Sequence, residues 1–90
     1  DREYVLSRQL LRSGTAIGAL IREAEQAESR ADFVHKLSVA LKEASETAYW
    51  LDLLTESGYL DSVHGQSMMS DTEELLKILT AIIRTTKRRR

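Results

Sequence analysis

The 90-residue sequence contains no cysteine and no proline, and only 6% of its residues are aromatic. The lack of cysteine excludes disulfides and thiolate metal sites. No apolar run approaches the roughly 20 residues that a membrane-spanning helix needs, and no signal peptide is visible, so we expect a cytoplasmic protein. Leucine, alanine and charged residues dominate what is present, which predicts an all-α chain.

Charge is unevenly distributed along the chain. Residues 1–86 carry nine basic and fourteen acidic side chains, a net charge of −5, and the last four residues, Lys87 to Arg90, add four positive charges. The body is therefore acidic and the tail is basic. A chain of this length is expected to form one domain over residues 1–90, with a core that is marginal unless something adds to it.

Capping signals and periodicity predict three helices. Ser7 and Ser29 are good N-caps, and Ser70 with Glu73 forms a capping box. We expect the connection between the second and third helices to be long for a bundle and to lie against it. The predicted helices cover about residues 8–27, 30–57 and 71–86, the connection covers 59–69, and the basic tail covers 87–90.

The second predicted helix has the strongest periodicity. Its seam repeats at steps of four and three over three heptads and consists of Phe33, Leu37, Ala40, Ala44, Thr47, Leu51 and Leu54. Gly58 suits the position just past the C-terminal cap. Short linkers between long helices favour antiparallel, up-and-down topology. The end of this helix is expected to lack an equally long partner on the chain.

The stretch RSGTAIGALIRE, residues 12–23, places small residues inside a predicted helix. Each glycine costs a helix roughly 1 kcal/mol relative to alanine. We therefore expect Ser13, Gly14, Ile17 and Gly18 to admit a closely packed neighbouring helix. A phosphate-binding loop is not expected, because these residues lie within a helix and not at its N-terminus.

Residues along most of the chain fit the pattern of a known family. The first part of the pattern is matched by Gln9, Leu10, Arg12, Ser13, Ile17, Ala19, Ile21, Glu23 and Ala24. The second part is matched by Ser29, Asp32, Phe33, Lys36, Leu37, Ala40, Leu41, Lys42, Glu43, Ala44, Glu46, Thr47, Tyr49, Trp50 and Leu51. Gly58, Tyr59, Glu73, Glu74 and Leu75 also agree. Over about Glu3 to Lys87 the chain thus resembles the bacterial 23S rRNA intervening-sequence proteins, also called four helix bundle proteins and formerly S23 ribosomal proteins.

The resemblance implies an antiparallel up-and-down four-helix bundle, commonly assembled as a homopentamer. It also implies a further helix before the three visible here, so we expect the family's N-terminal helix to be missing from this sequence. Leu20 and Ala16 replace a polar Asn and Ser of the family pattern, so no role is carried over for that Asn. A related family, the accessory protein of diversity-generating retroelements, is a basic pentamer that binds nucleic acid and a reverse transcriptase.

No set of side chains suited to catalysis or to a cofactor can be placed. The carboxylates Glu23, Glu43 and Glu46 invite comparison with di-iron bundles. Those bundles need a histidine three residues after a glutamate, and neither His35 nor His64 has a Glu at that distance. We therefore expect no catalytic residue, no cofactor and no metal.

The second helix carries apolar groups on two sides. Opposite its seam a helical wheel groups Val39, Glu43, Glu46, Trp50 and Leu53. One interpretation is that Trp50 covers the missing first helix or the 59–69 connection. The other is a subunit interface, where Trp is enriched. The two interpretations are compatible.

The C-terminal cations admit two interpretations. Arg84, Lys87, Arg88, Arg89 and Arg90 could contact nucleic-acid phosphates. Alternatively, they complement the dipole at the helix C-terminus and are otherwise solvated. Two functions follow: a non-enzymatic oligomeric adaptor associated with RNA or a nucleoprotein partner, or a purely protein-binding scaffold. A homo-oligomer, foremost a pentamer, is the partner state expected in both cases.

Overall fold

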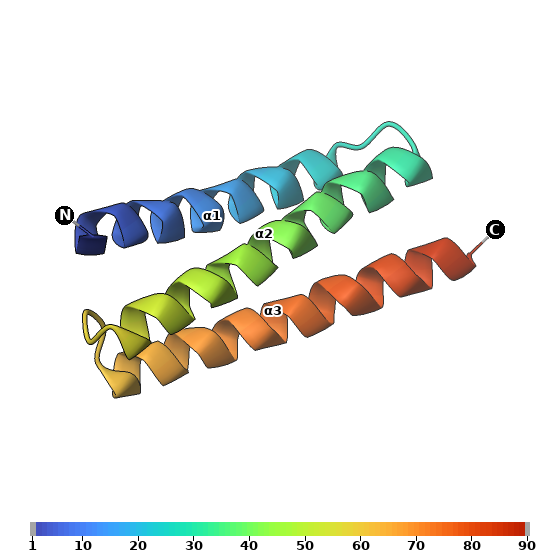
Figure 1. Ribbon diagram of the computed structural model, residues 1–90. Coiled ribbons are helices and arrows are strands. Elements are labelled where there is room, and N and C mark those ends of the chain that lie inside the picture. The colour runs from blue at the N-terminus through green and yellow to red at the C-terminus, as the bar shows by residue number, and fades with distance from the viewer. Residues whose placement is uncertain (1, 90) are drawn as a thin grey trace.

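Three long helices make up the computed structural model, which describes residues 2–89, with side chains from residue 4 on. Helix α1 spans Arg2–Glu25, α2 spans Arg30–Glu56 and α3 spans Ser62–Arg88. The predicted all-α class is confirmed, and the described residues contain no strand. Figure 1 shows that the chain reverses direction at both loops, so the N-terminus lies at the end of the α2–α3 loop and the C-terminus at the end of the α1–α2 loop.

Helix α1 begins earlier than the sequence predicted. Ser7, expected as an N-cap, lies inside the helix. The turn before it has contacts of its own, because Leu6 is buried and the Arg8 guanidinium lies 5.7 Å from the centre of the Tyr4 ring. Residues four apart are neighbours on a helix surface, so this cation–π pair favours the helical state of the first turns.

Both predicted caps of α2 are present. The Ser29 hydroxyl accepts a 3.0 Å hydrogen bond from the Asp32 backbone N–H. At the other end Gly58 has a φ of +81°, which a glycine adopts without steric cost. The N–H of Tyr59 bonds to the carbonyl of Leu54, and the N–H of Gly58 bonds to the carbonyl two turns' end later, at Thr55. These two bonds form a Schellman motif, which ends the helix.

The predicted start of the third helix is wrong. The helix begins at Ser62, so most of the expected connection is helical and Ser70 lies inside α3. Asp61 acts as the N-cap, with its carboxylate accepting a 2.9 Å bond from the His64 N–H. Two N-cap signals compete here, and the earlier one prevails because it gives the intervening backbone groups helical partners.

The early start gives α3 the same length as α2, 27 residues. The expectation that the end of α2 lacks an equally long partner is therefore wrong. Gly65 of the added turns is buried close to Thr55 of α2, and a Cβ on Gly65 would lie 2.4 Å from the Thr55 Oγ1 atom. The absence of a side chain at Gly65 thus allows the first turns of α3 to approach α2 closely.

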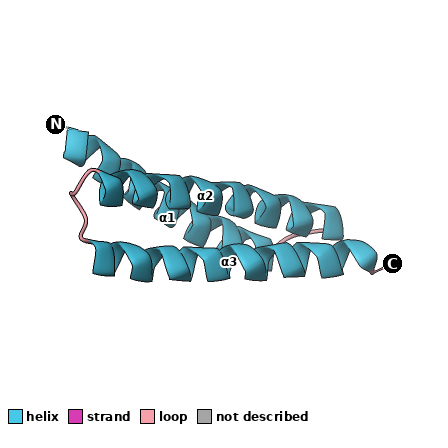
Figure 2. Ribbon diagram, turned by 60° about the horizontal axis from the view of Figure 1, so that its bottom comes forward, coloured by secondary structure: helices cyan, strands magenta, loops and turns pink. Residues whose placement is uncertain are grey.

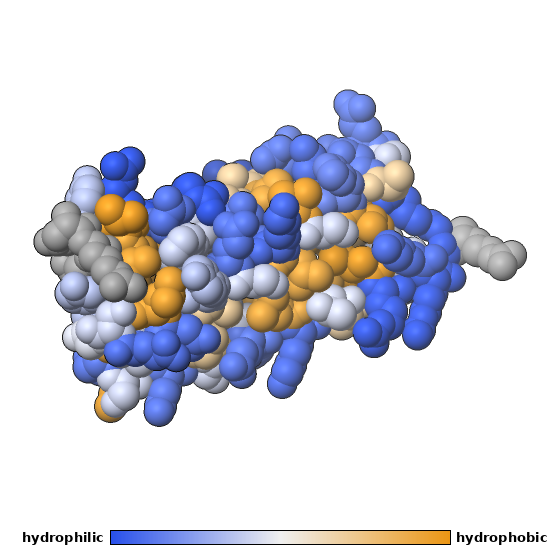
Figure 3. Space-filling view, viewed as in Figure 1, coloured by the Kyte–Doolittle hydropathy of each residue, from blue (hydrophilic) through white to orange (hydrophobic). Residues whose placement is uncertain are grey.

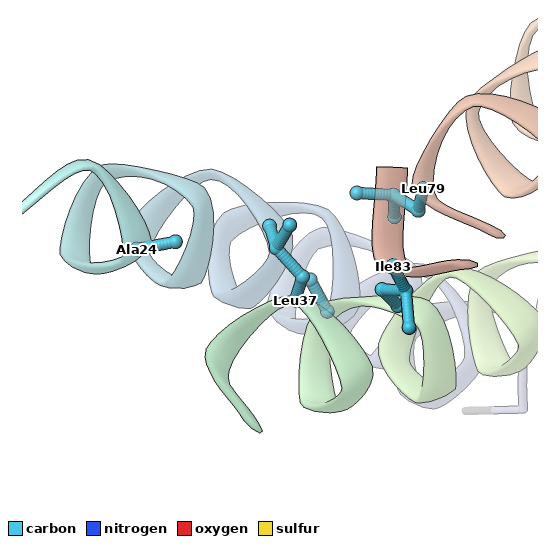
Figure 4. Packing of buried hydrophobic residues seen from close by; sticks show 5 residues of the cluster. Ala24, Leu37, Leu79 and Ile83 are labelled. Carbon is cyan, nitrogen blue, oxygen red and sulfur yellow. The ribbon is translucent and has the colours of Figure 1, made fainter. Parts of the chain in front are cut away.

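The core combines residues of all three helices. Six of the seven predicted seam residues of α2 are buried, and Phe33 is partly buried against the core. Figure 4 shows the central cluster, where Ala24 of α1 and Leu37 of α2 meet Leu79 and Ile83 of α3. The heptad pattern therefore predicted which face of α2 is buried.

Helix α2 lies between its two neighbours. It contacts both α1 and α3, but the described residues of α1 and α3 have no Cα atoms within 8 Å of each other. The Cα atoms span 48 × 21 × 13 Å, and a flat layer of helices would be only about 5 Å thick by the Cα radius of a helix. The helices are therefore not coplanar, and α1 and α3 form the walls of a shallow trough with α2 at its base (Figures 1 and 2).

Candidate functional site

An ion-pair cluster joins α1 to the C-terminal half of α2. The Arg12 guanidinium lies 2.8 Å from a carboxylate oxygen of Glu46 and 3.4 Å from one of Glu43. It also donates to the side chains of Gln9 and Ser13, at 3.1 and 3.4 Å. The negative charge of Glu43, followed by the hydrogen bonds to both carboxylates, raises the pKa of Arg12 above its ordinary value. The cluster fixes the position of α1 along α2.

Glu43 and Glu46 were expected on an outer face of α2, yet they lie beside α1. Their carboxylates are engaged by Arg12, and the side chain of Glu43 is only 16% exposed. The third carboxylate of the metal interpretation, Glu23, is 3.0 Å from the Lys36 ammonium and raises its pKa through that hydrogen bond. Across residues 2–89 no three metal-binding side chains gather in a group that could hold an ion.

The apolar members of the same predicted face, Val39, Trp50 and Leu53, are partly buried. The Trp50 ring packs edge-on against Tyr49, with centroids 5.0 Å apart. Its Nε1–H is buried and has no acceptor among the described residues. Buried indole N–H groups usually find a partner, so this group singles out Trp50. A subunit-interface role for the face stays a prediction.

The four small-run residues divide between two sides of α1. Ser13 and Ile17 are buried, at 0% and 7% exposure. Gly14 and Gly18 are exposed, and a Cβ on either would meet nothing within 4 Å. Within the described chain the closely packed glycine is instead Gly65, which the sequence reading left in a loop. The packing role of Gly14 and Gly18 therefore concerns a neighbour other than α2 and α3.

The walls of the trough carry apolar and small residues. On α1 the flank toward α2 is marked by the ion pairs of Arg12 and Glu23, and the opposite flank of the buried line carries small and apolar residues. On α3 the corresponding flank lies on the far side of Leu79 from α2, where Ile78 and Ile82 are 47% and 39% exposed. We call this surface the open face, and it consists of Leu10, Gly14, Gly18 and Ile21 of α1 and Leu75, Ile78 and Ile82 of α3.

Hydrophobic surface is not confined to the interior. In the orientation of Figure 1 it forms a band along the middle of the molecule, and hydrophilic residues border this band and cover the C-terminal end (Figure 3). Within the part of the chain that the structure describes, no helix has the length and apolarity to cross a membrane.

Cations gather where α3 ends beside the start of α2. The Arg30 guanidinium donates a hydrogen bond to the backbone carbonyl of Arg89. We call this surface the basic end, and it consists of Arg30, Arg84, Lys87, Arg88 and Arg89, all exposed. Arg90, the last predicted contact, lies outside the described residues. The sequence reading missed Arg30, which lies 59 residues from Arg89, although its place directly after the cap Ser29 was a local signal.

An all-α chain of three long helices, with interaction surfaces and without a catalytic grouping, is the class that these observations define. A model of the 23S rRNA-intervening sequence protein family matches residues 1–81. The chain therefore belongs to this family, and the resemblance read from its motifs is confirmed.

A solved structure supports the same assignment. A protein with unknown function from the S23 ribosomal protein family of Bacteroides thetaiotaomicron is 56% identical, with a TM-score of 0.87. The match covers 89% of this chain and 71% of that chain. No curated protein matches the chain.

Proposed function

We propose that this protein is a non-enzymatic oligomeric adaptor, built as an antiparallel four-helix bundle and associated with RNA or a nucleoprotein partner. The open face is the observation that carries the proposal. Exposed isoleucines on one wall and exposed glycines on the other suit a fourth helix that enters the trough and buries both walls. Burial of that apolar area would stabilise a fold whose core is small on its own.

The fourth helix has a natural source in the family. The resemblance implies an N-terminal helix, and the Bacteroides thetaiotaomicron structure extends beyond the match, which covers 71% of its chain. Gly14 and Gly18 lie one turn apart on the open face. A helix packed there would approach α1 closely, which gives the two glycines the packing role that no described neighbour supplies.

Gly14→Leu tests the fourth helix. The new side chain meets nothing in the described chain, so it should stabilise an isolated three-helix chain slightly through helix propensity, by about 1 kcal/mol. In a completed bundle it should instead destabilise, by about 1–3 kcal/mol through overpacking. Thr15→Leu, at the adjacent exposed position, is the control. Urea unfolding of the protein in its natural length decides, and equal stabilisation by both variants would reject a helix on the open face.

Assembly into a homopentamer is the second part of the proposal. Val39, Trp50 and Leu53 present apolar surface on α2 away from its buried seam, and the buried Trp50 N–H lacks an acceptor in the described chain. A closed ring brings two different surfaces of each subunit together, so a neighbouring copy would cover Trp50 and supply that acceptor.

Native mass spectrometry of the natural-length protein and of Trp50→Ala tests the ring. A pentamer is expected, weakened by the substitution. A protein that stays monomeric at tens of micromolar would contradict the ring. A pentamer of unchanged stability in Trp50→Ala would place Trp50 outside the subunit contact.

The basic end supports the RNA partner, because exposed cations without ion-pair partners among the described residues attract phosphates. The alternative, a purely protein-binding scaffold, is favoured by the net charge of −5 over residues 1–86. A salt-dependent RNA-binding curve separates the two. If deletion of residues 87–90 leaves the affinity and the salt slope unchanged, the tail is not the contact.

A further inference from the structure

The start of α2 and the end of α3 form a hollow with cationic edges. The hollow has a volume of about 620 Å³ and is lined by Arg30, Ala31, Val34, His35, Ser38 and Lys87. Arg30 and Lys87 come from different helices, and the hydrogen bond from Arg30 to the Arg89 carbonyl ties the two helix ends together. The floor between the cations is apolar at Ala31 and Val34.

The local charges favour an anionic ligand. From Leu75 to Arg89 the chain contains no acidic residue. The acidic residues nearest in sequence to Arg30 are Glu28, in the α1–α2 loop, and Asp32, whose charge acts on Lys36 and raises the pKa of that lysine. The Ser38 hydroxyl already donates to the Val34 carbonyl at 2.8 Å, so it supplies no free donor within the hollow.

We propose that this hollow binds single-stranded RNA, with one base against Ala31, Val34 and the His35 ring and the flanking phosphates at Arg30 and Lys87. An apolar floor next to an aromatic ring suits the flat face of a base, and cations on both sides suit its two phosphates. The bases of a duplex are paired and stacked, so only a single strand presents a free base to the hollow. The inference rests on the RNA part of the proposed function and names its ligand and its contact residues.

Fluorescence anisotropy with a labelled polyuridine of about ten nucleotides, against the natural-length protein at several salt concentrations, tests the inference. Ala31→Glu places a negative charge on the floor at an exposed position near a helix N-terminus, where an acidic residue is tolerated. It should lower the affinity about tenfold or more, because it repels phosphates and fills the base position. Ala19→Glu makes the same change at an exposed position of α1 and should lower it far less.

Two further variants separate stacking from charge. His35→Ala should weaken binding about fivefold at every salt concentration, because it removes a stacking surface. Lys87→Gln should weaken binding and reduce the slope of log affinity against log salt by about 0.7, because one phosphate contact is lost. Arg22→Gln, an exposed arginine of α1, is the matched charge control. Circular dichroism confirms that each variant keeps its helices.

The outcomes distinguish the inference from the proposed function. No binding by the unaltered protein would reject both. Binding that depends on Arg88 and Arg89 but tolerates Ala31→Glu and His35→Ala would keep RNA as the partner and reject the hollow. Equal affinity for a duplex of the same length would reject the single-strand preference. Displacement of the RNA by polyglutamate at equal charge concentration would assign the hollow to an acidic protein segment instead.

Discussion

Against α1, helix α2 presents charge, and against α3 it presents shape. The α1–α2 seam contains the ion pairs of Arg12 with Glu43 and Glu46 and of Lys36 with Glu23. The α2–α3 seam has no ion pair between its helices in the described residues, and it is closest where Gly65 meets Thr55. Charged groups act over several ångströms and tolerate small shifts, whereas a contact between backbone and side chain does not. The difference indicates that α3 is held in one register more strictly than α1.

The largest effect is expected at the shape-determined seam. Gly65→Leu should destabilise the protein by about 2–3 kcal/mol, because the new side chain collides with Thr55 in a well-packed site. Thr55 has little freedom to move, since its hydroxyl is bonded to the Leu51 carbonyl at 2.8 Å. Urea unfolding measures the change. Gly18→Ala, where nothing lies within 4 Å, should stabilise slightly in an isolated three-helix chain.

The same collision can be relieved from the other side of the seam. Thr55→Ala removes the atom that lies 2.4 Å from the modelling position of a Gly65 Cβ and leaves the Thr55 Cβ at 3.3 Å. In the background of Gly65→Ala it should therefore recover much of the lost stability. Additive costs in this double-mutant cycle would show that the two residues do not constrain each other.

A smaller effect is expected at the charge-determined seam. Arg12→Met removes the counter-charge of two glutamates, and Glu43, with its side chain 16% exposed, is left with a poorly solvated carboxylate. We expect the melting temperature to fall by a few degrees, less than for Gly65→Leu. Glu43→Gln should restore part of the loss in Arg12→Met. Lys36→Gln is the control, since its partner Glu23 is half exposed and such pairs contribute little.

The smallest effect concerns the N-cap of α3 and appears only in acid. The hydrogen bond from the His64 backbone N–H, followed by that from the His64 ring, lowers the pKa of Asp61 below its ordinary value of 3.8. A carboxylate with a lowered pKa stabilises the fold above pH 3.8, and this contribution is lost as the pH falls through the lowered value. Asp61→Asn keeps a good cap and should be as stable as the parent protein in strong acid. Denaturant midpoints from pH 5 to pH 2.5 measure this, and a constant difference between the two proteins would contradict it.

The parts of the fold that sequence reasoning predicted are those fixed by local patterns. The seam of α2 follows from an uninterrupted heptad pattern, and Ser29 and Gly58 cap the helix through bonds to residues at most five positions away. The start of α3 was mispredicted because Asp61 and Ser70 are both capable N-caps. The choice between them depends on the packing of Gly65 against Thr55, across a loop.

The candidate sites divide in the same way. The cations at the end of α3 were visible as a run of basic letters, but Arg30 joins them only because α2 and α3 are equally long and end side by side. Glu43 and Glu46 were placed by a helical wheel that shows directions around one helix. A wheel carries no information about which neighbour occupies each direction, so the contact with Arg12 could not be read from it.

Because α1 and α3 do not touch, each exchanges free energy with the other only through α2. Distant changes that share no partner combine additively, so damage to one wall of the trough leaves the other wall's contact with α2 intact. A helix in the trough would contact both walls and add a second route between them. The energetic coupling between a residue of α1 and a residue of α3 is thus itself a measure of whether the trough is filled.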